Sequence, residues 1–170
     1  NDLGEYQIGR VCVRGPSVMA GYFQDQEATD KCLSADKWLD TGDVGYMKQG
    51  SLYIIGRIKD LIIINGKNHW PQDIEWAVEQ LEELRSGDTA AISIPGEREE
   101  EIPAILVQCR TRDEAERAMM EGRVKDTVHS MLGISPVVAL IPPRSLPRTS
   151  SGKLSRVKAR KQYLAGELVI

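Results

Sequence analysis

Residues 71–81 read PQDIEWAVEQL, and this stretch has the pattern of a helix that packs on a sheet. Pro71 is tolerated at a first helical position, and the acid that follows it favours a helix N-terminus. Ile74, Val78 and Leu81 recur at helical spacing and share one face. The glutamates fall mostly on the opposite face, where we expect solvent: Glu75, Glu79, Glu82 and Glu83. The pattern therefore predicts an amphipathic helix with one buried side.

The segments around this helix alternate between expected strands and helices. The run at 58–66 is rich in β-branched side chains and ends at an Asn65–Gly66 turn signal. Further strands are expected at 88–96, 101–110 and 135–143, the first two joined by the charged loop Glu97–Glu100, and further helices at 113–132 and 155–166. This order predicts an α+β domain, in which helices pack on a small mixed or antiparallel sheet.

The first third of the chain is richer in strands. Residues 7–15 alternate like a strand, residues 24–35 read as a short helix, and residues 44–57 read as a hairpin that turns at Gln49–Gly50. The opening NDLGEYQIGR reads as the middle of a domain. We therefore expect residues 1–57 to be a β-rich remnant of a larger domain, and the chain to be a fragment.

Charge is distributed unevenly along the chain. The net charge of −3 is too small for steering by the whole molecule, but residues 144–161 carry seven basic residues and no acid. A nucleic-acid-binding module is one reading of this block. Tyr163 is the only aromatic residue nearby, so a stacking platform is missing, and we expect no nucleic acid partner.

The cysteines and histidines indicate neither a disulfide framework nor a metal site. Cys12, Cys32 and Cys109 are far apart and form no CxxC pair, which suits reduced thiols in a cytoplasmic protein. His69 and His129 have no partners at metal-site spacing. The longest apolar runs are too short to span a membrane.

Three motifs contain residues suited to nucleotide chemistry. In LPRTSSGKLSR (146–156), Lys153 follows a run of small and hydroxyl residues, where a mobile ammonium could neutralise a phosphate. Neither GK pair fits a P-loop, because the required glycine and hydroxyl positions are occupied by other residues. Asp43 in WLDTGDVG (38–45) could accept hydrogen bonds from sugar hydroxyls. Arg57 and Lys59 in GRIKD (56–60) flank the point where the remnant ends.

Each motif also has a purely structural reading. The Lys153 segment could be a solvated surface loop, and WLDTGD could be an Asx-type turn that enters the hairpin. The charges of GRIKD could protect an exposed strand edge. The order and spacing of the motifs are more informative than any one of them.

Together, GRVCVRGPSVMAGYF, WLDTGD, GRIKDLIIINGKN and LPRTSSGKLSR resemble the last third of the acyl-adenylate-forming (AMP-binding) superfamily. Within it, the chain is most similar to fatty acyl-AMP ligases, which load a fatty acid onto a carrier protein of a polyketide or lipopeptide pathway. The resemblance implies that residues 61–170 form a C-terminal lid domain, residues 58–60 a hinge, and residues 1–57 the tail of the large domain.

The resemblance also implies roles for individual residues. Lys153 would be the adenylation lysine, bridging the carboxylate and the α-phosphate. Asp43 would bind the ribose hydroxyls of ATP, and Arg57 would lie against the ribose and phosphate. Lys59 would be the hinge residue, and Gly66 would lie on the loop that faces the entering pantetheine arm. Mg²⁺ would accompany ATP, with its ligands, the phosphate loop and the acyl pocket in the missing N-terminal domain.

The motifs leave two readings of the acceptor of the acyl group. Asn68 stands where many relatives of the resembled family have a basic residue, so we expect no phosphate contact from this position. The basic helix around Arg156, Lys158, Arg160 and Lys161 is suited to dock an acidic carrier protein. A long-chain acyl-CoA ligase is the alternative enzyme, and a non-catalytic carrier-docking module is an alternative of another class. The fragment alone is expected to be inactive.

Overall fold

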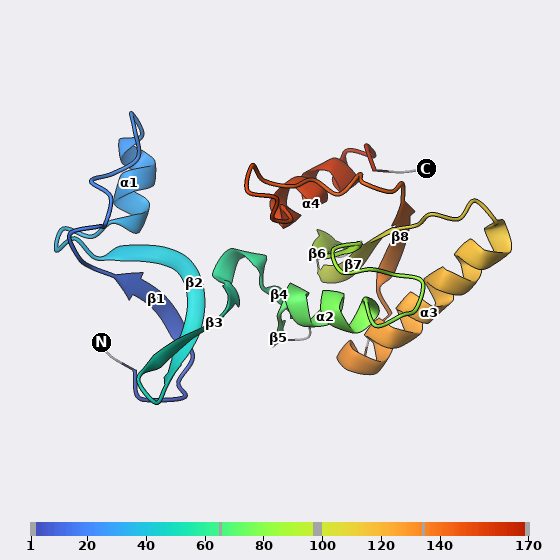
Figure 1. Cartoon of the computed structure of the whole chain (residues 1–170), viewed down its shortest axis with the longest axis horizontal. Helices are drawn as coiled ribbons and strands as arrows, with labels where there is room; N and C mark the ends of the chain where they lie inside the picture. Colours follow the sequence, from blue (N-terminus) through green and yellow to red (C-terminus); the bar gives the residue numbers. More distant parts are fainter. Residues whose placement is uncertain (1–2, 65, 97–99, 134, 169–170) are drawn as a thin grey trace. The chain divides into compact units, whose positions relative to one another are not determined.

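The computed structural model describes residues 3–64, 66–96, 100–133 and 135–168. The chain divides into two compact units, residues 1–59 and residues 60–170. Figure 1 labels the helices and strands of each unit. None of the described helices is both long enough and apolar enough to cross a membrane.

The first unit contains a three-stranded antiparallel sheet in the order β1-β2-β3. Its elements are β1 (Gly9–Val13), α1 (Gln26–Cys32), β2 (Leu39–Lys48) and β3 (Ser51–Arg57). Gln49 and Gly50 form the turn between β2 and β3, with φ of 49° and 74°. Two residues at positive φ are typical of a type I′ hairpin turn, so the predicted hairpin and its turn are confirmed.

The second unit is an α+β domain, as the sequence predicted. Its elements are β4 (Ile62–Ile64), β5 (Lys67–His69), α2 (Pro71–Val78), β6 (Thr89–Pro95), β7 (Glu101–Gln108), α3 (Glu114–Leu132), β8 (Val137–Ile141) and α4 (Arg156–Leu164). β6 pairs with β7 antiparallel, and β7 pairs with β8 parallel. The main sheet is therefore mixed. Helix α3 provides the crossover that the parallel connection from β7 to β8 requires.

The segment that precedes α2 differs from the expected single strand over 58–66. Residues Ile58–Asp60 form the 3-10 helix η1, and only the three isoleucines of β4 are extended. β5, which the sequence did not predict, pairs with β4 across the turn at Gly66. Asn65 of the predicted turn lies outside the described residues, as do positions 97–99 of the predicted charged loop.

Helices cover both faces of the β6-β7-β8 sheet. Figure 1 shows α2 and α3 on one side of this sheet and α4 on the other. The first layer buries Ile74, Val78 and Val124 against Ile105. The second layer buries Ala159 of α4 among residues of the opposite sheet face. Successive side chains of a strand point to opposite faces of the sheet. Since both faces are covered by helices, β7 is buried along nearly its whole length.

A buried acid, Asp88, stabilises the start of β6. Its carboxylate accepts hydrogen bonds from Arg110 (2.7 and 3.0 Å), from Gln108 (3.1 Å) and from the backbone N–H of Arg85 (3.0 Å). Burial disfavours the charged carboxylate, but the hydrogen bonds from Arg110 and its neighbours outweigh burial and lower the pKa of Asp88.

This lowered pKa has a consequence for stability against pH. A carboxyl with a folded pKa below its ordinary value of 3.8 stabilises the fold above that pH, and the contribution is lost as the pH falls through the folded pKa. We expect Asp88→Asn to reduce the free energy of unfolding at pH 7 by about 2 kcal/mol and to flatten its decline below pH 4. Urea titrations of both proteins at several pH values measure the free energy of unfolding. If it declined as steeply below pH 4 in Asp88→Asn as in the wild type, the lowered pKa of Asp88 would be contradicted.

Candidate active-site residues

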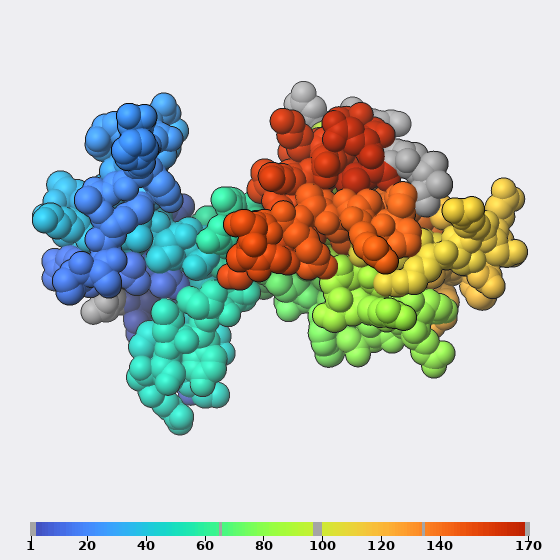
Figure 2. Space-filling model, turned by 45° about the horizontal axis from the view of Figure 1, so that its top comes forward, coloured from blue at the N-terminus to red at the C-terminus, as the bar shows by residue number. Residues whose placement is uncertain are grey.

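Lys153 lies at the end of a closed surface loop between β8 and α4. Figure 2 shows this region, in orange, at the surface of the second unit. The backbone N–H of Thr149 donates to the carbonyl of Lys153 (2.8 Å), and the N–H of Gly152 donates to the carbonyl of Thr149 (2.9 Å). The N–H of Lys153 also donates to Thr149 Oγ1 (3.2 Å). The side chain of Lys153 is left exposed.

The loop is better ordered by hydrogen bonds than its small residues suggested. Gly152 has a φ of 80°, a conformation that favours glycine, and this allows the chain to turn back on itself. Arg148 donates to the carbonyls of Gly152 (3.0 Å) and Gly87 (3.1 Å). The loop therefore presents Lys153 from a hydrogen-bonded frame, although the sequence pattern indicated a flexible support.

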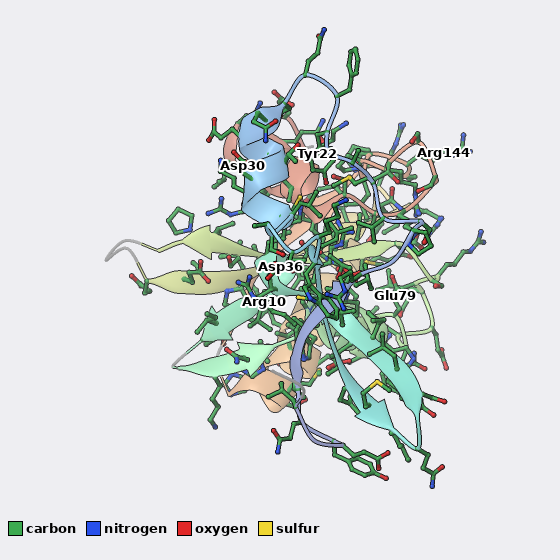
Figure 3. All side chains as sticks on the ribbon, turned by 90° about the vertical axis from the view of Figure 1, so that its left-hand side faces the viewer. Arg10, Tyr22, Asp30, Asp36, Glu79 and Arg144 are labelled. Carbon is green, nitrogen blue, oxygen red and sulfur yellow. The ribbon has the colours of Figure 1, made fainter. Side chains whose placement is uncertain are left out.

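The Gly87 end of this frame is held by a glutamate of the region that follows α2. Glu79, labelled in Figure 3, accepts hydrogen bonds from the N–H groups of Gly87 (2.8 Å) and Thr89 (3.1 Å). Burial raises the pKa of Glu79, against the lowering effect of these two bonds. The sequence placed Glu79 on a solvent face, but its carboxylate supports the backbone before β6.

Asp43 and Arg57 are brought together in the first unit. They face each other across the β2-β3 pair, and Arg57 Nε donates to Asp43 Oδ1 (3.1 Å). The preceding residues form the expected Asx-type turn, because Asp40 Oδ1 accepts from the N–H of Gly42 (2.9 Å). The structural reading of WLDTGD is thus correct for Asp40. Asp43 itself is half-buried, and its Oδ1 is paired with Arg57.

Gly66 forms the turn between β4 and β5. Its φ is 73°, a backbone conformation that favours glycine. Space does not require glycine here, because a Cβ built at this position would meet no atom within 4 Å. Lys67 and Asn68, which follow it on β5, are exposed. Lys59 is exposed within η1, next to the point where the chain divides into its two units.

One constellation was missed from the sequence. Arg156, the first residue of α4, donates to both oxygens of Glu75 (2.8 and 2.6 Å) and to Asp60 Oδ2 (3.2 Å). Two expectations are therefore wrong. Glu75 is buried instead of facing solvent, and the Arg156 side chain is only 15% exposed and so is not part of an open docking face. No local signal could have found this group, since its members are 81 and 96 positions apart.

Two other features of the chain bear on cofactors. Among the residues that the structure describes, no group of three or more His, Cys, Asp or Glu side chains could hold a metal ion. The cysteines are free thiols: Cys12 is exposed, Cys32 is half-buried and Cys109 is buried. The described part of the chain thus offers carboxylate, guanidinium and ammonium groups for a ligand.

The chain is similar to proteins of known family. A family model described as the AMP-binding enzyme C-terminal domain matches residues 66–161. A putative acyl-CoA synthetase of Caulobacter vibrioides is 48% identical over 165 residues, which is 96% of this chain and 29% of that protein. The medium-chain-fatty-acid–[acyl-carrier-protein] ligase JamA of Moorena producens is 38% identical over 181 residues, which is 95% of this chain and 29% of that protein.

A solved structure has the same fold. It comes from structural and functional studies of fatty acyl-adenylate ligases from E. coli and L. pneumophila, and it is 45% identical with a TM-score of 0.83. The match covers 96% of this chain and 29% of that one. The chain therefore spans less than a third of the length of each of these proteins.

Proposed function

Because this chain belongs to the AMP-binding enzyme C-terminal domain family, we propose that it is the C-terminal portion of a fatty acyl-AMP ligase. The enzyme converts a fatty acid and ATP to an acyl-adenylate and pyrophosphate, and then transfers the acyl group to the thiol of an acyl carrier protein. The observation that carries this proposal is the 45% identity to a structure from studies of fatty acyl-adenylate ligases, over nearly the whole chain.

The exposed ammonium of Lys153 supports the proposed adenylation step. A lysine is a compact charge, and it stabilises the negative charge that develops between the carboxylate of the fatty acid and the α-phosphate of ATP. Because the frame around Lys153 is hydrogen-bonded, little ordering of the loop remains to be done when the substrates bind. Lys153 is therefore the proposed catalytic residue of this portion.

Asp43 and Arg57 are the proposed nucleotide-binding residues. The carboxylate of Asp43 accepts hydrogen bonds from the ribose hydroxyls, and Arg57, already paired with it, approaches the ribose and phosphate. ATP is bound with Mg²⁺, whose charge offsets that of the phosphates. We place the magnesium ligands, the phosphate loop and the acyl pocket outside this chain, so that the chain alone is inactive.

The same proposal assigns a role to each segment of the chain. Residues 1–57 are the tail of the large domain, residues 58–60 are the hinge, and residues 61–170 are the lid. The first unit leaves large apolar side chains uncovered, such as Phe23 (90% exposed) and Ile8 (61% exposed). The proposed large domain would cover side chains of this kind. Lys59 is the proposed hinge residue.

The acceptor is proposed from the loop at Gly66. Coenzyme A carries three phosphates, whereas the arm of a carrier protein carries one. Lys67 is the one cation among the described residues of β4, the turn and β5, and Asn68 beside it is neutral. A carrier protein needs fewer phosphate contacts from this loop, because the surface of the carrier supplies further contacts. Lys158, Arg160 and Lys161 remain exposed on α4 and are suited to dock an acidic carrier.

We expect the full-length enzyme to acylate a holo-carrier protein at least about 10-fold faster than it forms acyl-CoA, since one phosphate contact is worth about 1.5–3 kcal/mol. Labelled fatty acid and ATP are supplied with both acceptors at equal concentration. Asn68→Arg is the matched test of the loop, and it should increase acyl-CoA formation selectively.

Comparable rates with the two acceptors would overturn the carrier assignment. That result would favour the alternative enzyme, a long-chain fatty acyl-CoA ligase. The 48% identical relative is named a putative acyl-CoA synthetase. Absence of acyl-adenylate with every fatty acid tested would overturn the ligase proposal itself.

A further inference from the structure

Arg156 is held in an unusually complete set of charged contacts. Its Nε and one terminal nitrogen donate to the two oxygens of Glu75, and the other terminal nitrogen donates to Asp60. The side chains of Arg156, Glu75 and Asp60 are only 15%, 11% and 13% exposed. A planar guanidinium can hold two carboxylates in fixed directions at once, which a lysine ammonium cannot do.

This network anchors the loop that presents Lys153. The loop is closed at its base, where the N–H of Ser155 donates to the carbonyl of Pro147 (2.9 Å). Arg156 is the next residue, so its contacts fix the C-terminal leg of the loop. Glu75 Oε1 also accepts from the N–H of Ala91 in β6 (2.9 Å), which connects this anchor to the central sheet.

The same network reaches the beginning of the second unit. Asp60 is the first residue of that unit, directly after Lys59. Through Arg156, the position of Asp60 is tied to the leg of the loop that carries Lys153, although 96 positions separate Asp60 from Arg156. A unit that turns about its first residue moves a distant side chain accurately only if the connection between them is stiff.

Stability alone does not account for this arrangement. Burying an ion pair generally gains little over apolar packing of the same volume, because the charges lose their hydration. Here one guanidinium serves two carboxyl groups, and all three side chains have low exposure. Burial disfavours the charged guanidinium, but Glu75 and Asp60 outweigh it and raise the pKa of Arg156, which therefore stays cationic.

We propose that Arg156 is a positioning residue for Lys153, which it holds in register with Asp60 at the start of the second unit through the shared contacts with Glu75. The inference rests on the proposed function, because it takes Lys153 as the adenylation lysine. Arg156 itself touches no substrate in this account. Its contribution is geometric, and it should affect the turnover of adenylation more than the binding of ATP or fatty acid.

The experiment compares four variants of the full-length enzyme. Arg156→Lys keeps the positive charge and removes the planar guanidinium. Asp60→Asn removes one carboxylate, whereas Asp60→Glu keeps a carboxylate at this position. Glu83→Gln is the matched control, because it removes the same kind of charge from an ion pair with Arg123 in the same unit. For each variant, pyrophosphate release gives kcat and KM, and transfer from supplied acyl-adenylate gives the second half-reaction.

We expect kcat for adenylation to fall about 100-fold in Arg156→Lys and about 10-fold in Asp60→Asn, as a displacement of about 1 Å can produce. KM for ATP and fatty acid should change by less than about 2-fold, and Asp60→Glu should recover most of the rate. Glu83→Gln should match the wild type. Wild-type kcat in both Arg156→Lys and Asp60→Asn would overturn the proposal, as would an equal loss of both half-reactions with a lower Tm.

Amide hydrogen exchange in the full-length protein provides a readout that needs no activity. In Arg156→Lys, exchange at Gly152 and Lys153 should rise about 10-fold, because opening of the loop becomes easier by about 1.4 kcal/mol. Exchange along β7 should not change. Unchanged exchange at the loop would overturn the positioning role even if the enzyme proved to have another activity. Inactivity of the wild type with faster loop exchange in Arg156→Lys would reject the proposed function and retain the anchor.

Discussion

Replacing Lys153 with alanine in the full-length enzyme is expected to slow acyl-adenylate formation by about 100- to 1,000-fold. Loss of a cation that stabilises transition-state charge commonly costs about 3–4 kcal/mol, and each 1.4 kcal/mol is a factor of ten in rate. The fold should tolerate the change. The side chain is exposed, and the contacts of Lys153 within the loop are made by its backbone, which alanine retains.

Two measurements separate a catalytic Lys153 from a structural one. Pyrophosphate release reports the first half-reaction, and transfer from supplied acyl-adenylate reports the second. We expect the second to continue near the wild-type rate, since the proposed lid turns Lys153 away for that step. Lys125→Ala removes a lysine from a surface pair with Glu121 on α3, and it should leave both half-reactions unchanged. Equal loss of both half-reactions in Lys153→Ala would assign the lysine a structural role.

Replacing Lys59 with proline is expected to separate the two half-reactions from each other. Lys59 lies in the 3-10 helix η1, where φ is close to the value near −65° that proline imposes. A hinge must change its dihedral angles, so proline should lock one orientation of the lid and exclude the other. We expect one half-reaction to be retained and the other to be slowed by about 100-fold, because its groups can no longer be brought into place.

Lys59→Ala is the matched control for this variant. It removes the same side chain but leaves φ free, so a hinge role predicts that both half-reactions survive in it. A similar defect in Lys59→Ala and Lys59→Pro would mean that the lysine side chain, and not backbone rotation, is required. Wild-type rates in Lys59→Pro for both half-reactions would place the hinge at another residue.

The sequence by itself determined the class of the fold and the order of its helices and main strands, but not η1 and β5. Local signals were sufficient for these features. Gly50 favours the turn that β2 and β3 adopt, and Pro71 begins α2 where its missing N–H is tolerated. The short motifs around Asp43, Arg57 and Lys153 likewise identified the family, since they depend on neighbouring residues in a fixed order.

Only the tertiary structure decided which charged residues are buried. Glu75 and Glu79 follow the helical pattern of a solvent face, yet one is buried against Arg156 and the other supports the backbone at Gly87. Arg156 resembles its basic neighbours Lys158 and Lys161 in sequence, but its low exposure and two carboxylate partners set it apart. A charged side chain is accepted inside a protein when a partner satisfies it. That partner lies 81 positions away in sequence, so periodicity along the chain carries no information about it.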